Sequence, residues 1–196
     1  MANLGFQTVY QLLNAQPSFL CERAFLSVSG NEARCVSGTA GIFSLENQKA
    51  LTEFDILAFS ISFENDYPNI LKIMDDAGMP LRSADRSEKY PLILGGGIAP
   101  TLNPEPLADF FDLFVLGEAE DILPVFCRFF EASRRLGQRR EQFLKDAQKQ
   151  LHHVYVPGLY DVHYSPERKI TSVVPREAGL PEKIKVFGEE FLTNKI

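Results

Sequence analysis

One stretch of the sequence, residues 92–121, constrains the fold more than any other. It reads LILGGGIAPTLNPEPLADFFDLFVLGEAED. The apolar residues 92–94 predict a strand that runs into a glycine triplet, and 112–116 predict a second strand that ends at Gly117 and Glu118. Ligands of open α/β sheets lie outside the carboxyl ends of the strands, where such turns occur. The stretch therefore predicts a ligand-binding edge, and it contains no nucleophile and no metal-binding cluster.

Strand and helix patterns alternate from residue 54 to residue 136, which favours a parallel sheet with right-handed crossovers. We therefore predict an α/β fold: a Rossmann-like open parallel sheet with flanking helices, plus a small C-terminal β-hairpin. The expected strands are 22–28, 54–62, 92–94 and 112–116, with hairpin strands 154–164 and 169–174. The expected helices are 3–14, 68–77, one that starts near Asn103, 122–136 and 141–151.

The order of the first elements is unusual for such a sheet. An α/β sheet normally begins with a strand, yet this sequence begins almost directly in a helix. We expect either that the sheet starts with strand 22–28 or that a first strand is missing from this polypeptide. The predicted organisation is a cofactor domain over 1–150, a hairpin appendage over 151–175 and a linker over 176–196.

Composition excludes several classes of function. The chain has 196 residues, is 45% hydrophobic and carries a net charge of −6, which argues against nucleic-acid binding. Its three cysteines form neither CxxC nor CxxxCxxC, so the chain by itself offers no iron–sulfur motif. There is no signal-peptide pattern and no apolar run long enough to span a membrane. We expect a cytoplasmic protein with no membrane partner.

The glycine triplet is the first candidate site. Gly95, Gly96 and Gly97 let the backbone approach a ligand closely, and free N–H groups of a following helix favour negative charge. The triplet is not a dinucleotide fingerprint, because Pro100 stands where the third glycine belongs, and it is not a P-loop. The alternative is a tight strand-to-loop turn without a ligand.

Polar residues follow the other predicted strands. Ser60, Ser62 and Glu64 come at the end of the central strand, and Gly117 and Glu118 end the next. Such groups can hydrogen-bond a polar ligand, whereas the simpler interpretation is that the acids cap or complement the helices that follow. There is no G-x-S-x-G, H-E-x-x-H or D-x-H-x-x-G pattern. The sequence therefore predicts no catalytic residue and no metal ligand in this chain.

Six segments of the chain carry a resemblance to known proteins: Asn3–Gln7, Cys21–Phe25, 54–71, 77–86, 95–121 and 154–162. Together they resemble the N-terminal part of a family of radical SAM proteins. That region resembles a B12-binding (cobalamin-binding) domain with a Rossmann-like fold. The resemblance is most specific between residues 54 and 121, where several motifs occur in order.

The resemblance implies a cofactor-binding role within a larger enzyme. Loops 60–64, 95–104 and 117–118 would line a cobalamin pocket, which adds Thr101 and Pro104 to the expected cofactor-binding residues. Without D-x-H-x-x-G, the chain lacks the usual histidine ligand to cobalt. A radical SAM barrel with a [4Fe–4S] cluster and S-adenosylmethionine would follow the domain and act as its partner. The family also implies a strand just before the Asn-Leu-Gly helix.

Two other functions stay open. In one, the fold is an interaction module with an empty pocket, which docks against the barrel or against a second copy to form a homodimer. In the other, the glycine loop and the helix start bind a different small ligand, such as a nucleotide.

Overall fold

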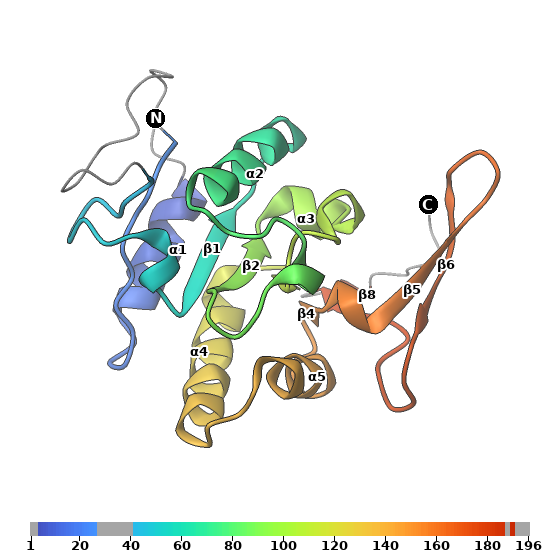
Figure 1. Ribbon diagram of the computed structural model, residues 1–196. Helices are drawn as coiled ribbons and strands as arrows, with labels where there is room; N and C mark the ends of the chain where they lie inside the picture. Colours follow the sequence, from blue (N-terminus) through green and yellow to red (C-terminus); the bar gives the residue numbers. More distant parts are fainter. Residues whose placement is uncertain (1–3, 27–40, 187–188, 191–196) are drawn as a thin grey trace.

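A mostly parallel sheet of four strands forms the centre of the protein (Figure 1). The computed structural model describes residues 4–26, 41–186 and 189–190. The strand order is β1-β2-β3-β4; the first three strands run parallel and β4 is antiparallel to β3. This arrangement confirms the predicted α/β class. The strands are β1 (Ile56–Ser60), β2 (Leu92–Gly96), β3 (Leu113–Val115) and β4 (Val154–Tyr155).

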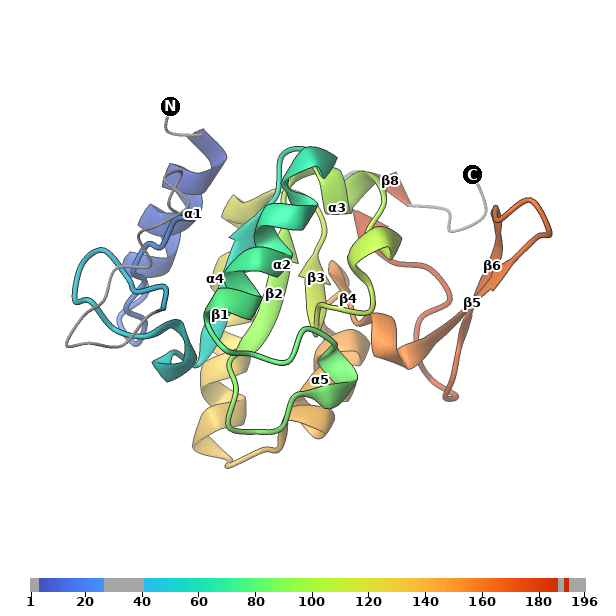
Figure 2. The ribbon, with the colours of Figure 1, turned by 45° about the horizontal axis from the view of Figure 1, so that its top comes forward.

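Helices cover both faces of this sheet, as Figure 2 shows. One face packs against α2 (Tyr67–Asp76) and α3 (Ile98–Leu102), and the other against α4 (Ala119–Arg135) and α5 (Arg140–Gln150). The remaining helix, α1 (Leu4–Asn14), packs on α4 at the β1 side of the sheet.

Alternation along the strands sends neighbouring side chains to opposite faces. Ile93 and Phe114 belong to the core cluster on the α2 side, whereas Leu94 and Val115 belong to the cluster on the α4 side. Both faces are covered, so these strands read as continuous apolar runs rather than as alternating patterns. The short strands β2 and β3 were predictable for that reason.

A buried ion cluster fixes the start of β3. Asp112 lies between Arg86 and Arg140, at N–O distances of 3.3 and 3.2 Å. The same carboxylate accepts the main-chain N–H of Ile93 at 2.6 Å, which ties the cluster to β2. Burial lowers the pKa of Arg86, and the charge of Asp112 acts against that change. The cluster holds the two strands in register where the loops enter the sheet.

The expected hairpin is present, but it begins later than predicted. It consists of β5 (Tyr160–Tyr164) and β6 (Ile170–Pro175), and it projects away from the sheet in both ribbon views. The prediction of one strand over 154–164 was wrong, because a 3-10 turn at Pro157–Leu159 separates β4 from β5. β4 instead completes the main sheet.

Part of the segment that follows the hairpin is packed against the domain. Leu180 and Ile184 are buried, and the Tyr160 hydroxyl donates to the carbonyl oxygen of Pro181 at 2.9 Å. The two short strands β7 (Lys185–Val186) and β8 (Glu189–Glu190) pair with each other. The division of the chain into domains stays a prediction.

The prediction of a helix that starts near Asn103 was also wrong. The chain reverses at Gly97, whose φ of +105° lets α3 start at Ile98. Asn103 ends α3, and its side-chain oxygen accepts the N–H of Glu105 at 3.2 Å, which leads only into a 3-10 turn.

The predicted strand 22–28 is not formed in its described part. Residues 22–26 have no regular secondary structure, and 27–28 lie outside the described residues. The sheet therefore begins with β1, which has β2 on one side and, among the described strands, none on the other.

Candidate functional site

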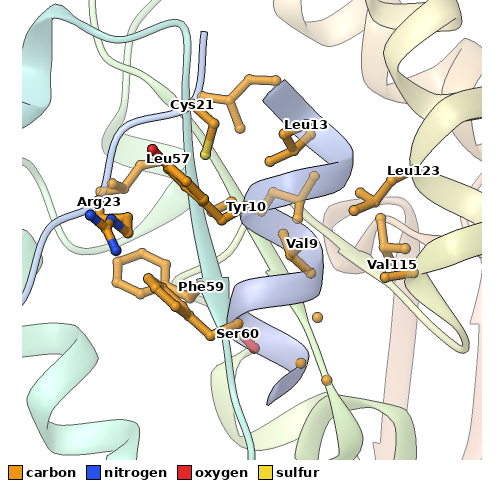
Figure 3. A pocket seen from close by; sticks show the side chains of 18 of the residues that line it. Val9, Tyr10, Leu13, Cys21, Arg23, Leu57, Phe59, Ser60, Val115 and Leu123 are labelled. Atoms are coloured by element: carbon orange, nitrogen blue, oxygen red, sulfur yellow. The ribbon is translucent and has the colours of Figure 1, made fainter. Parts of the chain in front are cut away.

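A cavity of about 780 Å³ separates α1 from the sheet (Figure 3). Protein interiors are close-packed, and voids larger than a water molecule are few. A volume of this size is therefore space for a ligand or for a further structural element rather than a packing defect.

The body of the cavity is apolar. Figure 3 shows Val9 and Leu13 of α1 on one side and Val115 and Leu123 on another. None of the residues of α1 is buried, although its sequence carries an apolar stripe. The helix thus presents an apolar face to a space that the described residues do not fill.

Residues 21–26 form the outer wall of the cavity and are tied to α1. The side chain of Asn14 donates to the carbonyl oxygen of Cys21 at 3.1 Å and accepts its N–H at 3.0 Å. The guanidinium of Arg23 lies 4.8 Å from the centre of the Tyr10 ring and pairs with Glu46 at 2.8 Å. These contacts make α1 and the segment one unit.

The cavity reaches the carboxyl ends of β1, β2 and β3. Six of the ten predicted cofactor-binding residues line it there. This is the edge at which open α/β sheets bind ligands. The six are Ser60, Gly96, Gly97, Thr101, Gly117 and Glu118.

The other four predicted residues do not line the cavity. Ser62 and Pro104 are half-buried outside it and Glu64 is exposed. Gly95 faces the opposite side of the sheet, where a Cβ would meet the Phe114 ring at 2.5 Å. Packing against the Phe114 ring therefore explains the glycine at position 95 without a ligand. That any of the ten contacts a ligand stays a prediction.

The two remaining glycines of the triplet differ from each other. Gly97 has positive φ, and a Cβ there would lie 2.5 Å from the carbonyl oxygen of Ile61. A Cβ on Gly96 would make only an ordinary van der Waals contact, because its nearest neighbour would be the Val115 carbonyl oxygen at 3.5 Å. Gly97 is thus required by the turn, whereas Gly96 leaves open space on the cavity side.

Charged groups on the lining are mostly acidic. Four carboxylate residues and one arginine contribute to it. The Cys21 thiol also lines the cavity, and burial, with the charges of Glu46 and Glu22, raises its pKa to about 11. A thiol in this state is a poor nucleophile at neutral pH. The charged residues are Glu22, Arg23, Asp66, Glu118 and Glu120.

The described residues show no metal centre. No group of three or more His, Cys, Asp or Glu side chains in 4–26, 41–186 and 189–190 is arranged to hold a metal ion. His152, His153 and His163 are not among the residues that line the cavity. In the same part of the chain, no helix has the length and apolarity needed to cross a membrane.

Sequence reasoning missed the larger part of this site. The predicted residues form only the carboxyl end, whereas α1, residues 19–26 and the side of β1 form the body. The apolar stripe of α1, none of whose residues is buried, is the sequence signal that could have indicated this wall of the cavity.

Two comparisons with known proteins give matches. The sequence model of the N-terminal region of radical SAM proteins matches residues 5–157. The uncharacterized protein MJ0966 of Methanocaldococcus jannaschii is 35% identical over 80 residues, which are 41% of this chain. That match spans only 16% of the archaeal protein's length. No solved structure matches the chain.

Proposed function

Because the chain belongs to the family of N-terminal domains of radical SAM proteins, we propose that it is the ligand-binding domain of such an enzyme and holds a corrinoid. The ligand lies at the carboxyl edge of the sheet, over Gly96 and Gly117. The observation that carries the proposal is the large cavity that reaches this edge at the predicted loops. The S-adenosylmethionine and [4Fe–4S] chemistry belongs to a radical SAM barrel, the proposed partner.

The space beside Gly96 suits a corrinoid, whereas the described residues that line the cavity include no histidine to bind its cobalt. The side of Gly96 is open where a side chain would otherwise stand, which suits a bulky cofactor next to the strand end. No described histidine lines the cavity, so these residues give cobalt no imidazole ligand. A bound corrinoid supplies cobalt-centred radical or alkyl chemistry, and the chain's own residues bind and orient it.

Polar side chains at the carboxyl edge of the sheet provide hydrogen-bonding groups for a ligand. Ser60 and Thr101 offer hydroxyls to the polar rim of a ligand, and the exposed Glu118 offers a carboxylate. The apolar cavity body excludes water from the face of the ligand that it contacts.

A nucleotide polyphosphate fits this edge less well. α3 is only five residues long, and the N–H of Ala99 in its first turn already donates to Ile61. Acidic residues outnumber the one arginine on the lining, which disfavours a multiply charged anion. The interaction module remains the second candidate, because Phe63, Ile98 and Leu102 expose apolar surface at the same edge.

A titration of the purified chain with hydroxocobalamin, followed by absorption spectroscopy and calorimetry, tests the proposal. We expect saturable binding that is lost in Gly96→Leu, whose side chain enters the cavity. The matched control is Gly158→Leu, because Gly158 has open space around it and lies away from the cavity. ATP serves as the competing probe. A folded chain that binds no cobalamin would contradict the proposal and favour the interaction module.

A further inference from the structure

Part of the predicted linker 176–196 reaches the wall of the cavity. Val186 of β7 lines the cavity, whereas every other described residue of that wall lies between Leu4 and Phe126. In Figure 2, β8, which pairs with β7, lies at the end of the sheet at which α3 begins. Residues 180–186 therefore connect the hairpin to the ligand site, and we refer to them as the strap.

Buried side chains and one hydrogen bond anchor the strap to the domain. The hydroxyl of Tyr160, the first residue of β5, donates to the carbonyl oxygen of Pro181 at 2.9 Å. Leu180 and Ile184 are buried, and Ile184 belongs to the core cluster that also contains Tyr160. The strap therefore follows a defined path over the domain, and its last residue, Val186, has a defined place in the cavity wall.

The alternation of an extended chain explains how the strap leaves the core and meets the cavity. Ile184 directly precedes β7 and Val186 ends it, and residues two positions apart in an extended chain face the same side. Ile184 is a member of the core cluster on the α2 side of the sheet, and Val186 packs against the same cluster. Because Val186 also lines the cavity, it continues an apolar row from the core into the ligand site.

Val186 differs in kind from the predicted binding residues that line the carboxyl edge. Those residues are glycines, two hydroxyl side chains and the carboxylate of Glu118. The side chain of Val186 has no hydrogen-bonding group, and it offers only apolar contact area. Its contribution to the site is therefore steric: it is a solid wall beside groups that bind the polar rim of a ligand.

We propose that Val186 contacts the bound ligand as an apolar wall of the site, and that ligand binding stabilises the docked strap. This role of Val186 rests on the proposed function, because it requires a ligand in the cavity. A ligand that contacts Val186 favours the docked strap over a released one, and by linkage the anchoring of the strap favours ligand binding. A change at Tyr160, which does not line the cavity, should therefore alter ligand affinity.

Amide hydrogen exchange over residues 180–186, measured by mass spectrometry, tests the coupling. In the wild type we expect bound hydroxocobalamin to slow exchange of the strap at least about threefold. Tyr160→Phe removes the bond to Pro181, and it should speed exchange without ligand and weaken binding, each at least about threefold. Tyr164→Phe is the matched control and should change neither, because Tyr164 is an exposed residue of the same strand outside the cavity wall. Strap exchange that bound ligand leaves unchanged would overturn the proposal.

Substitution of Val186 tests the contact itself. Val186→Trp adds bulk to the cavity wall and should weaken hydroxocobalamin binding at least about tenfold. Val174→Trp is the matched control and should bind as the wild type does, because Val174 is exposed on β6 and does not line the cavity. Val186→Ala is the variant for the case that the tryptophan prevents folding; it removes apolar contact and should weaken binding at least about twofold. Wild-type affinity in the folded variants at position 186 would overturn the proposal and leave the proposed function standing.

A second probe separates the role of Val186 from the identity of the ligand. Nile red, a neutral apolar dye, reports occupancy of an apolar cavity by its fluorescence. If the wild type binds the dye but no corrinoid, the proposed function fails, whereas Val186→Trp should still weaken dye binding at least about tenfold. Equal dye affinity in that variant would overturn the role of Val186 as well. A folded wild type that binds neither probe would overturn both proposals.

Discussion

Gly97 lies against the backbone of Ile61 so closely that a Cβ on Gly97 would come within 2.5 Å of the Ile61 carbonyl oxygen. Its φ and ψ of +105° and −176° also fall in a region that glycine alone adopts readily. The N–H of Ala99 donates to the same Ile61 oxygen at 3.3 Å, so the turn closes the carboxyl end of β1 onto β2.

We expect Gly97→Ala to lower the free energy of unfolding by at least about 2 kcal/mol, because strain and a backbone clash add together. Urea denaturation of both proteins measures the difference. Gly96→Ala is the matched control and should change stability by no more than about 1 kcal/mol, since its Cβ has ordinary contacts. Equal losses at both positions would contradict the separate roles of these glycines.

Asp112→Asn should destabilise the protein by about 3–5 kcal/mol, because the fully buried Arg86 guanidinium loses its carboxylate partner. Thermal unfolding at neutral pH measures the loss. Asp109→Asn is the control: its pair with Arg82 is 3.5 Å long and exposed on both sides, so we expect a change within about 0.5 kcal/mol. A similar small effect of Asp112→Asn would show that the buried cluster is dispensable.

The raised pKa of Glu105 should make the free energy of unfolding decrease as pH rises. Burial raises the pKa of Glu105 above its ordinary 4.5, the charge of Asp109 adds to this, and the hydrogen bond from the Tyr155 hydroxyl, at 2.6 Å, acts against it. The folded state therefore binds the proton more tightly than the unfolded state does. Its stabilising contribution is complete below pH 4.5 and is lost as pH rises through the folded-state pKa.

The measurement compares wild type with Glu105→Gln by urea denaturation between about pH 4 and about pH 8. The stability of wild type relative to the variant should decrease with rising pH. Glu167→Gln gives the opposite comparison, because the hydrogen bond from Ser165 lowers the pKa of Glu167 and wild type then gains relative stability with rising pH. A flat difference for Glu105 would contradict its assigned environment.

The Cys21 thiol should react slowly with alkylating reagents. With its pKa raised from 9.0 to about 11 by burial, the thiolate fraction near pH 8 falls about 100-fold. Mass spectrometry after timed iodoacetamide treatment measures labelling at Cys21 in the folded chain. The same chain in urea is the control, where Cys21 should react at the ordinary rate. Equal rates would place this thiol in open solvent.

The sequence determined those features that depend on local order along the chain. Continuous apolar runs predicted β1, β2 and β3, because strands covered on both faces need no alternation. The alternation of strand and helix patterns over residues 54–136 predicted α4 and the α/β class. The loops at the strand ends were predicted to meet, since parallel strands share a carboxyl edge.

Only the tertiary structure decided which glycine serves packing and which faces the cavity. Gly95 is required by the Phe114 ring and Gly97 by the Ile61 backbone, contacts between residues distant in sequence that no spacing rule contains. The same holds for residues 22–26, whose strand-like sequence remains irregular because a strand forms only when a neighbour accepts its hydrogen bonds. Local pattern specifies what a segment is able to form, and the presence of its partner in space decides whether it does.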